Sequence, residues 1–295
     1  MDSRISTRRR AAWSAVYAFA FAANWLLCRM ALGERSIDAA SFTTLRLGAG
    51  ALTLWLIVVV TRSRGAPRKR DWISAVTLFL YAIAFSFAYL SLTAGTGALV
   101  LFGAVQFTML AVGLRAGERF APLSWTGFVL AVAGLVYLVS PGLAAPAPVG
   151  ASLMAVAGIA WGVYSLRGRG VADPLLASSG NFVRTLPLTL VVSALFIANA
   201  QASWSGVALA VASGAIASGA GYVIWYAALR GLTATRAATV QLSVPVIAAF
   251  GGVALLSERI TWRLLISSVA ILGGIGLVLM QRSARVVAAI KTEAS

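Results

Sequence analysis

Residues 39–61 read AASFTTLRLGAGALTLWLIVVVT, and this stretch decides the fold class. A helix needs about 20 residues to cross a hydrocarbon core of about 30 Å, and this run is long enough. Its one charged residue is Arg46. Because the apolar residues are continuous and do not alternate with polar ones, the pattern predicts a transmembrane helix and not a strand of a membrane barrel.

Nine further apolar runs of spanning length lie before and after this one. The connections are short, so we expect consecutive helices to be antiparallel neighbours with no room for a soluble domain. The first run is too long for the apolar region of a signal peptide, and we interpret it as an uncleaved span. The chain is therefore predicted to be an all-α integral membrane protein with ten transmembrane helices, at residues 12–32, 39–61, 72–93, 97–115, 122–140, 148–166, 175–198, 204–229, 235–256 and 262–281.

Composition agrees with this class and excludes others. Of the 295 residues 60% are apolar and 11% charged, and the net charge is +16. A strongly basic chain suggests nucleic-acid binding, but nearly all the charges lie between apolar runs, which argues against it. Cys28 is the only cysteine and histidine is absent, so the chain has no internal disulfide and no cysteine-based metal site.

The basic residues also predict the orientation. If the N-terminus is cytoplasmic, eighteen Lys and Arg residues fall in inner segments and four in outer segments. Cytoplasmic loops carry the basic excess in membrane proteins, so both termini are expected in the cytoplasm, with the chain in the bacterial inner membrane.

The two halves of the chain resemble each other in order. Trp25 precedes Arg46 as Trp161 precedes Arg184, and Glu118 lies 140 residues before Glu258. Five helices per copy is an odd number, so the second copy must enter the membrane from the opposite side. We therefore expect two inverted five-helix repeats, residues 1–143 and 144–295, with a substrate site near the midplane between them.

Carboxylates are missing from the expected spans, because all eight acidic residues map to loops or helix ends. Enzymes inside membranes generally need carboxylate pairs, histidine clusters or metal ligands. We therefore predict no enzymatic activity, no metal and no cofactor. Coupling of transport to protons through a buried carboxylate is also not expected.

Arg46 and Arg184 are the two ionisable residues deep inside expected spans. An arginine at a helix centre is costly in lipid, so it usually faces protein or water. One interpretation is a guanidinium that attracts a carboxylate of the solute. The other is structural, with each side chain reaching an interface or hydrogen-bonding helix ends.

Neutral polar and aromatic residues in the spans are the other candidates for contact with a solute. A lone amide in lipid is costly unless it is paired, and aromatic rings can form a wall against an apolar solute. Such rings are more often packed between helices or exposed to lipid. With Arg46, the predicted binding residues are Asn24, Trp25, Tyr81, Tyr89, Gln106, Trp161, Asn181, Tyr222, Tyr226 and Gln241.

The pattern as a whole resembles the drug/metabolite transporter superfamily in its EamA-type ten-helix branch. The resemblance covers residues 12–282 and rests on the ten helices in two halves and on Trp25, Arg46, Glu118-Arg119, Gly134, Glu258-Arg259 and Gly274. It implies alternating access to a central cavity and export of small metabolites. Within that branch the chain is similar to aromatic amino-acid exporters.

The leading hypothesis is therefore a facilitative or weakly coupled exporter of amino acids, with aromatic or large neutral side chains favoured. A transporter of a nucleoside, purine or sugar derivative is the first alternative, and a membrane scaffold without transport activity is the second. The expected partners are a small solute and the lipid bilayer, and the chain is compatible with a monomer.

Overall fold

The structure is a computed structural model, and it describes residues 23–61, 71–115, 122–140, 142, 145–168, 171, 173–221, 248 and 250–293. Within these ranges the regular elements are helices, and one isolated bridge joins Ile37 to Ala202. The prediction of an all-helical chain is confirmed for this part of the sequence.

The helices lie where the apolar runs predict them. A helix over 23–33 comes first, and residues 250–256 are helical before the last element. The other elements are α2 (Ala39–Thr61), α3 (Trp72–Ala88), α4 (Ala94–Arg115), α5 (Pro122–Val139), α6 (Pro148–Gly168), α7 (Pro174–Leu195), the short 3-10 helix η1 (Ile197–Asn199), α8 (Trp204–Ala212), the π-helix η2 (Ser213–Ala220) and α11 (Trp262–Glu293).

Five of these helices, α2 and α4 to α7, have the length and hydropathy of membrane spans. Shorter apolar helices cover Trp72–Ala88, Trp204–Gly219 and Trp262–Leu277. The expected spans 12–32, 204–229 and 235–256 are described only in part, so the count of ten helices extends beyond the described residues.

Two acidic residues of the described part cap the helices that follow them. Asp71 precedes α3 and accepts a hydrogen bond from the N–H of Ser74, and Asp173 precedes α7 and accepts one from the N–H of Leu176. A side-chain oxygen at this position satisfies a backbone donor that the first turn leaves without a partner. The carboxylates thus lie at helix ends, as the sequence predicts for the described part.

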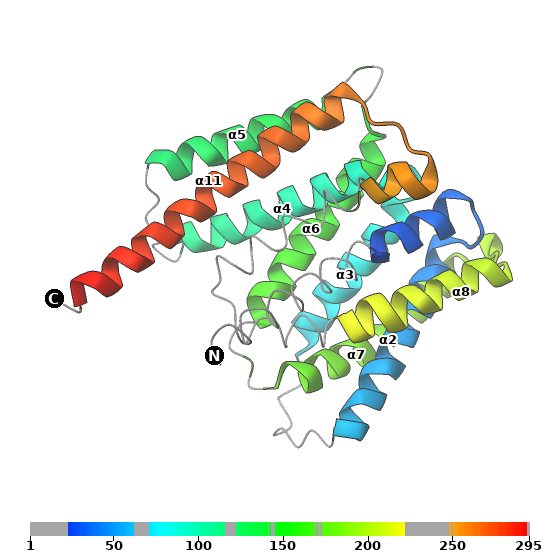
Figure 1. The fold of residues 1–295 in the computed structure, drawn as a ribbon. Coiled ribbons are helices and arrows are strands. Elements are labelled where there is room, and N and C mark those ends of the chain that lie inside the picture. Colours follow the sequence, from blue (N-terminus) through cyan, green and yellow to red (C-terminus); the bar gives the residue numbers. More distant parts are fainter. Residues whose placement is uncertain are drawn as a thin grey trace, which may run out of the picture.

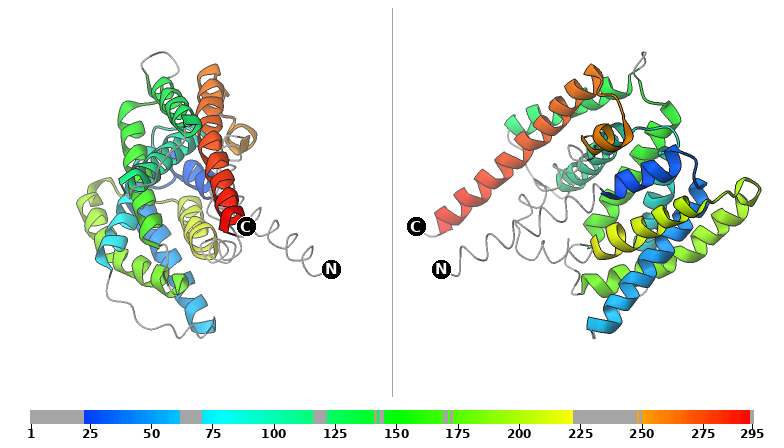
Figure 2. Two further views of the ribbon diagram at one scale, coloured as in Figure 1. Left: turned by 90° about the vertical axis from the view of Figure 1, so that its left-hand side faces the viewer. Right: turned by 45° about the vertical axis from the view of Figure 1, so that its right-hand side comes forward.

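The helices are arranged in an elongated bundle. α5 and α11 pack along each other at one edge, α6 packs against α3 and α4 in the middle, and α2 packs against α7 and η2 on the other side (Figure 1). Two further views show the same separation of the α5–α11 pair from α2 and α7 (Figure 2). With 32 residues α11 is about 48 Å long, so it extends past a hydrocarbon core of about 30 Å.

Large apolar side chains cover the outer surface of this bundle. Val60, Val269 and Phe250 are each more than 70% exposed. An exposed apolar surface of this extent suits a protein surrounded by lipid. Trp204 and Trp262, the first residues of their helices, are 91% and 79% exposed, which fits rings at the headgroup level.

Candidate functional site

Arg46 lies in the interior of the bundle, with only 2% of its surface exposed. From α2 its guanidinium donates a hydrogen bond to the hydroxyl of Tyr81 at 3.1 Å and a longer one to that of Ser218 at 3.4 Å. The thiol of Cys28 lies 4.0 Å from Nη1. The partners come from the helix over 23–33, from α3 and from η2, so one cation joins four segments.

A second set of polar groups lies beside Arg46. The hydroxyl of Ser213 donates to the side-chain oxygen of Asn24 at 2.7 Å and lies 3.8 Å from the thiol of Cys28. All three residues are buried. The Ser213 hydroxyl thus provides a polar partner for both the Asn24 amide and the Cys28 thiol. An isolated polar group in this buried region would be costly.

The π-helix η2 brings Ser213 and Ser218 to this place. These two serines are five residues apart, and a π-helix repeats its hydrogen bonds at that interval. Between them Gly214 lies so close to α2 that an added Cβ would overlap the carbonyl of Arg46. Glycine therefore permits the approach of η2 to α2, and π-turns of this kind often occur at functional sites.

Aromatic rings surround the guanidinium. Its central carbon lies 5.1 Å from the ring centre of Phe85 and 5.5 Å from that of Tyr81, within the range of cation–π attraction. Trp25 meets Phe85 edge-on at 5.0 Å, and Trp161 lies 4.9 Å from Tyr81. The Arg46 guanidinium thus lies against the rings of Tyr81 and Phe85, which in turn pack on Trp161 and Trp25.

We call this group the central cluster: Asn24, Trp25, Cys28, Arg46, Tyr81, Phe85, Tyr89, Phe102, Trp161, Ser213 and Ser218. Six predicted residues belong to it, namely Asn24, Trp25, Arg46, Tyr81, Tyr89 and Trp161. Tyr89 is fully buried and meets both Trp25 and Phe85 edge-on. Phe102 on α4 stacks on Trp25 at 5.7 Å.

The other predicted residues lie elsewhere or are not described. Gln106 is buried on α4, one turn after Phe102, and so points to the same side of that helix. Asn181 lies on α7 at a separate pocket. Tyr222, Tyr226 and Gln241 lie outside the described residues. Arg184, the expected counterpart of Arg46, is only partly buried, and its Nη1 lies 3.5 Å from the side-chain oxygen of Asn181 on its own helix.

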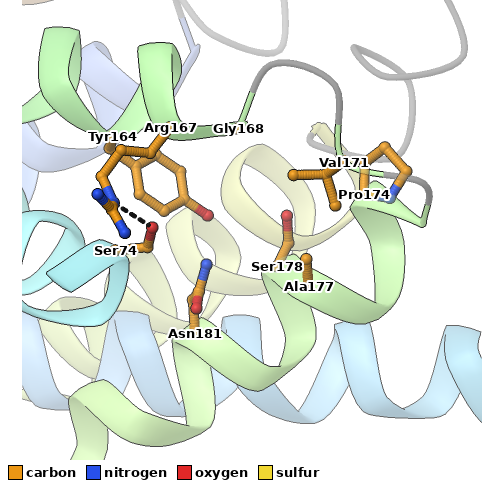
Figure 3. A pocket seen from close by; sticks show the side chains of 9 residues that line it. All are labelled: Ser74, Tyr164, Arg167, Gly168, Val171, Pro174, Ala177, Ser178 and Asn181. Atoms are coloured by element: carbon orange, nitrogen blue, oxygen red, sulfur yellow. Dashed lines mark hydrogen bonds between the residues drawn. The ribbon is translucent and has the colours of Figure 1, made fainter. Parts of the chain in front are cut away.

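That separate pocket lies at the end of the bundle where α6 ends and α7 begins. Its cavity volume is only about 20 Å³, and it is lined by residues of α3, α6 and α7 and by Val171 between the last two. The polar ends of Tyr164, Ser178 and Asn181 point into the same hollow, and Arg167 lies over Ser74 at its edge (Figure 3). We call this site the α6–α7 pocket.

An ion pair fixes Arg167 beside the α6–α7 pocket. Its Nη2 donates to the carboxylate of Asp71 at 2.8 Å, and its Nε donates to the hydroxyl of Ser74 at 3.1 Å. Burial alone would raise the pKa of Asp71, but hydrogen bonds from Ser74 and the charge of Arg167 outweigh it and lower the pKa to about 2. Asp71 is therefore a carboxylate at neutral pH.

The chemistry of the two sites favours binding over catalysis. Within the described ranges no three residues among His, Cys, Asp and Glu come together in a way that could hold a metal ion. The central cluster offers a guanidinium, hydroxyl groups, an amide and aromatic rings, which can recognise a carboxylate and an apolar group. Sequence reasoning missed Cys28, Phe85, Phe102, Ser213 and Ser218 as members of the cluster. The five-residue spacing of the two serines becomes a signal only once the π-helix is known.

Comparison with known proteins places these sites in a family context. A model of the EamA-like transporter family matches residues 148–280. The uncharacterized protein PA1977 of Pseudomonas aeruginosa is 50% identical over 266 residues, which cover 90% of this chain and 93% of that protein.

More distant relatives and one solved structure are similar over most of the chain. The threonine/homoserine exporter RhtA of Salmonella typhimurium is 28% identical, with 87% of this chain and 88% of that protein covered. The uncharacterized transporter YoaV of Bacillus subtilis is 23% identical, with 83% and 89% covered. A crystal structure of 21% identity has a TM-score of 0.62 and covers 90% of this chain and 98% of its own, which shows a common fold.

Proposed function

Because this chain belongs to the EamA-like transporter family of the drug/metabolite transporter superfamily, we propose that it exports amino acids, with aromatic and large neutral side chains favoured. It is a membrane transporter and not an enzyme. The observation that carries the choice of substrate is the buried guanidinium of Arg46, which lies among aromatic rings at membrane depth.

The guanidinium is the group we assign to the carboxylate of the amino acid. Its contacts with Tyr81, Ser218 and Cys28 are made with two hydroxyl groups and a thiol. A substrate carboxylate can replace these neutral partners of the guanidinium. No protein carboxylate then stays behind unpaired in the low-dielectric interior. A guanidinium can then hold the two carboxylate oxygens with parallel hydrogen bonds.

The rings of the central cluster are the surface we assign to the side chain of the substrate. Tyr81, Phe85 and Trp161 lie next to the guanidinium, so a molecule with a carboxylate at one end and an apolar or aromatic group at the other matches both parts. The RhtA relatives are threonine/homoserine exporters by name, which supports amino acids as the substrate class.

Alternating access between two inverted repeats is the mechanism that the helix contacts support. Along α5 and α11, Gly134 meets Ala270 while Gly127 meets Gly274, so these two helices run antiparallel. Along α2 and α7, Thr44 meets Ser193 while Gly50 meets Phe182, so this pair is antiparallel too. Among the ten expected helices, α2 and α7 are the second and seventh, and α5 and α11 are the fifth and tenth. Each pair is therefore equivalent in two five-helix copies, and inverted copies require the members of a pair to be antiparallel.

The division into repeats at residues 1–143 and 144–295 has support of its own. The family model begins to match at residue 148, where α6 begins. The excess of basic residues in alternate loops supports two cytoplasmic termini in the inner membrane. A monomer suffices for this mechanism, because the central cluster takes residues from one chain.

Transport by purified protein in liposomes tests the proposal. Vesicles that contain the protein are loaded with radiolabelled phenylalanine, threonine or a sugar. They should release both amino acids faster than protein-free vesicles do, and they should retain the sugar. Phenylalanine should leave faster than threonine if the rings select the side chain. Absence of amino-acid flux would overturn the proposal. If a nucleoside is transported and competes with phenylalanine, the substrate class would instead be another metabolite.

A further inference from the structure

The ion pair between Arg29 and Glu258 lies at the end of the bundle that the distribution of basic residues assigns to the outside. Arg29 is near the end of the helix over 23–33, and Glu258 follows the helix over 250–256, so the pair joins the two expected repeats. The carboxylate of Glu258 accepts hydrogen bonds from Arg29 Nε at 3.2 Å and from the N–H of Ala94 at 3.0 Å. We propose that Arg29 and this N–H form an exit subsite for the carboxylate of the amino acid, which Glu258 occupies until the substrate displaces it.

The bonds of Glu258 show that this place holds a carboxylate. A guanidinium and an N–H at the start of a helix both favour an anion, and hydrogen bonds to an ionised group are the strong ones. Ala94, the first residue of α4, is buried, so its N–H requires an acceptor. When Glu258 moves away, a substrate carboxylate restores the same bonds. The substrate thereby reduces the cost of breaking the ion pair, and a solute without a carboxylate does not.

Two glycines make room for the charged groups of this pair. A Cβ on Gly33 would overlap the guanidinium of Arg29, and a Cβ on Gly252 would overlap the carboxylate of Glu258. Glu258 belongs to the non-helical segment 257–261, so its side chain can leave without the separation of two helices. A ligand carboxylate then takes the space that the Glu258 carboxylate fills. The side chains of Arg29 and Glu258 are 25% and 11% exposed, so water reaches the pair from the outer face.

The exit subsite is continuous with the central cluster. The thiol of Cys28, the residue before Arg29, lies 4.0 Å from the guanidinium of Arg46. Trp25 lies about one helical turn before Arg29 on the same helix. Arg29 Nη1 donates a hydrogen bond to the carbonyl of Tyr89, whose ring meets Trp25 edge-on. A carboxylate that leaves Arg46 in the outward direction therefore finds a second guanidinium next to the cluster.

Opposite effects of two variants distinguish a binding site from a structural ion pair. Uptake of radiolabelled phenylalanine into right-side-out membrane vesicles gives the KM at the outer face, with vesicles that lack the protein as background. We expect Arg29→Gln to raise this KM about tenfold or more, because it removes a charged donor. Glu258→Gln removes the competing charge and should lower the KM about threefold or more. A pair that only holds helices together predicts a change in the same direction, since either variant breaks it.

Further variants protect the test against misfolding. Arg29→Lys keeps the positive charge and should keep the outer KM within about threefold of wild type. The double variant Arg29→Gln/Glu258→Gln should show the raised KM of Arg29→Gln, because loss of the competitor has no effect once the cation is gone. Glu34→Gln and Arg35→Gln are matched controls at exposed charged residues of the same face, and their KM should equal that of wild type.

A substrate analogue shows whether the carboxylate is the group that Arg29 recognises. Phenylalanine amide keeps the ring and the amino group and lacks the carboxylate. Its inhibition constant at the outer face should stay within about twofold of wild type in Arg29→Gln, since no charged hydrogen bond to it is lost.

The exit subsite rests on the proposed export of amino acids, and the results separate the two. Changes of the outer KM in the same direction in Arg29→Gln and Glu258→Gln, or no change in either, would overturn the subsite and leave the export function standing. A loss of inhibition by phenylalanine amide as large as the loss for phenylalanine would also overturn the subsite. Absence of phenylalanine flux in wild type would overturn the export function and the subsite together.

Discussion

Glu258 accepts a hydrogen bond from Arg29 Nε at 3.2 Å and thereby joins the end of the first helix to the loop after residues 250–256. Both oxygens of the same carboxylate lie 3.0 Å from the N–H of Ala94, the first residue of α4. Arg29 Nη1 also donates to the carbonyl of Tyr89 at the end of α3. Glu258 thus holds three helix ends together on the face predicted to be outside.

Breaking this contact should expose the interior from that face, and Cys28 can report it. The thiol is fully buried one residue before Arg29, and it is the only cysteine of the chain. Glu258→Gln replaces a charged acceptor with a neutral one, so we expect Cys28 to react about five times faster or more with an impermeant maleimide added outside intact cells. Glu34→Gln, at an exposed carboxylate of the same face, is the control, and equal labelling rates in both variants would count against this closure.

Removal of the guanidinium at position 46 should impair recognition of the carboxylate and not of the apolar group. We expect Arg46→Gln to lower kcat/KM for phenylalanine about tenfold to a hundredfold, with little effect on inhibition by an apolar analogue that lacks the carboxylate. Arg184→Gln is the matched control, because that side chain is partly buried and lies along its own helix. Loss of folded protein in Arg46→Gln, judged by yield and melting temperature, would assign Arg46 a structural role.

Much of the fold could be predicted because membrane spans are a strong signal. A helix that crosses lipid needs about 20 apolar residues, so the runs at 122–140 and 148–166 differ from α5 and α6 by at most two residues at each end. The absence of carboxylates from the expected spans could also be read directly from the positions of the acidic residues. The π-helix η2 was not predicted, because its apolar residues also fit an α-helix and only packing against α2 distinguishes the two.

The candidate site could be predicted only in part, because membership depends on distances between helices. Arg46 was evident, since a charge in an apolar run is rare. Arg46 and Arg184 occupy similar positions in the two halves of the sequence, but their guanidinium groups lie in different surroundings. Arg46 is buried, whereas Arg184 is only partly buried. Phe85 and Phe102 are ordinary apolar residues in their runs, and only the tertiary structure shows that they pack on Trp25.

The close contact of α5 with α11 predicts unequal effects at two neighbouring glycines. A Cβ on Gly274 would overlap the carbonyl oxygen of Gly127, whereas a Cβ on Gly273 would meet nothing within 4 Å. Overpacking of this kind costs about 1–3 kcal/mol. We therefore expect Gly274→Ala to lower the melting temperature in detergent by several degrees and Gly273→Ala to leave it unchanged or raise it, since alanine favours helix. Equal shifts in the two variants would contradict the close approach.

Stability should depend on pH through Asp71 in a defined window. Its pKa is lowered from 3.8 to about 2 in the folded protein, so the carboxylate stabilises the fold fully above the unfolded value and loses that effect as the pH falls towards the folded value. Asp71→Asn keeps an oxygen to cap α3 and removes the charge that faces Arg167. We expect the difference in melting temperature between wild type and Asp71→Asn to be constant from about pH 7 to about pH 5 and to shrink below about pH 4. Arg167→Gln should weaken the same dependence, because the charge of Arg167 helps to lower this pKa; a difference that shrinks already between pH 7 and pH 5 would show that another group controls it.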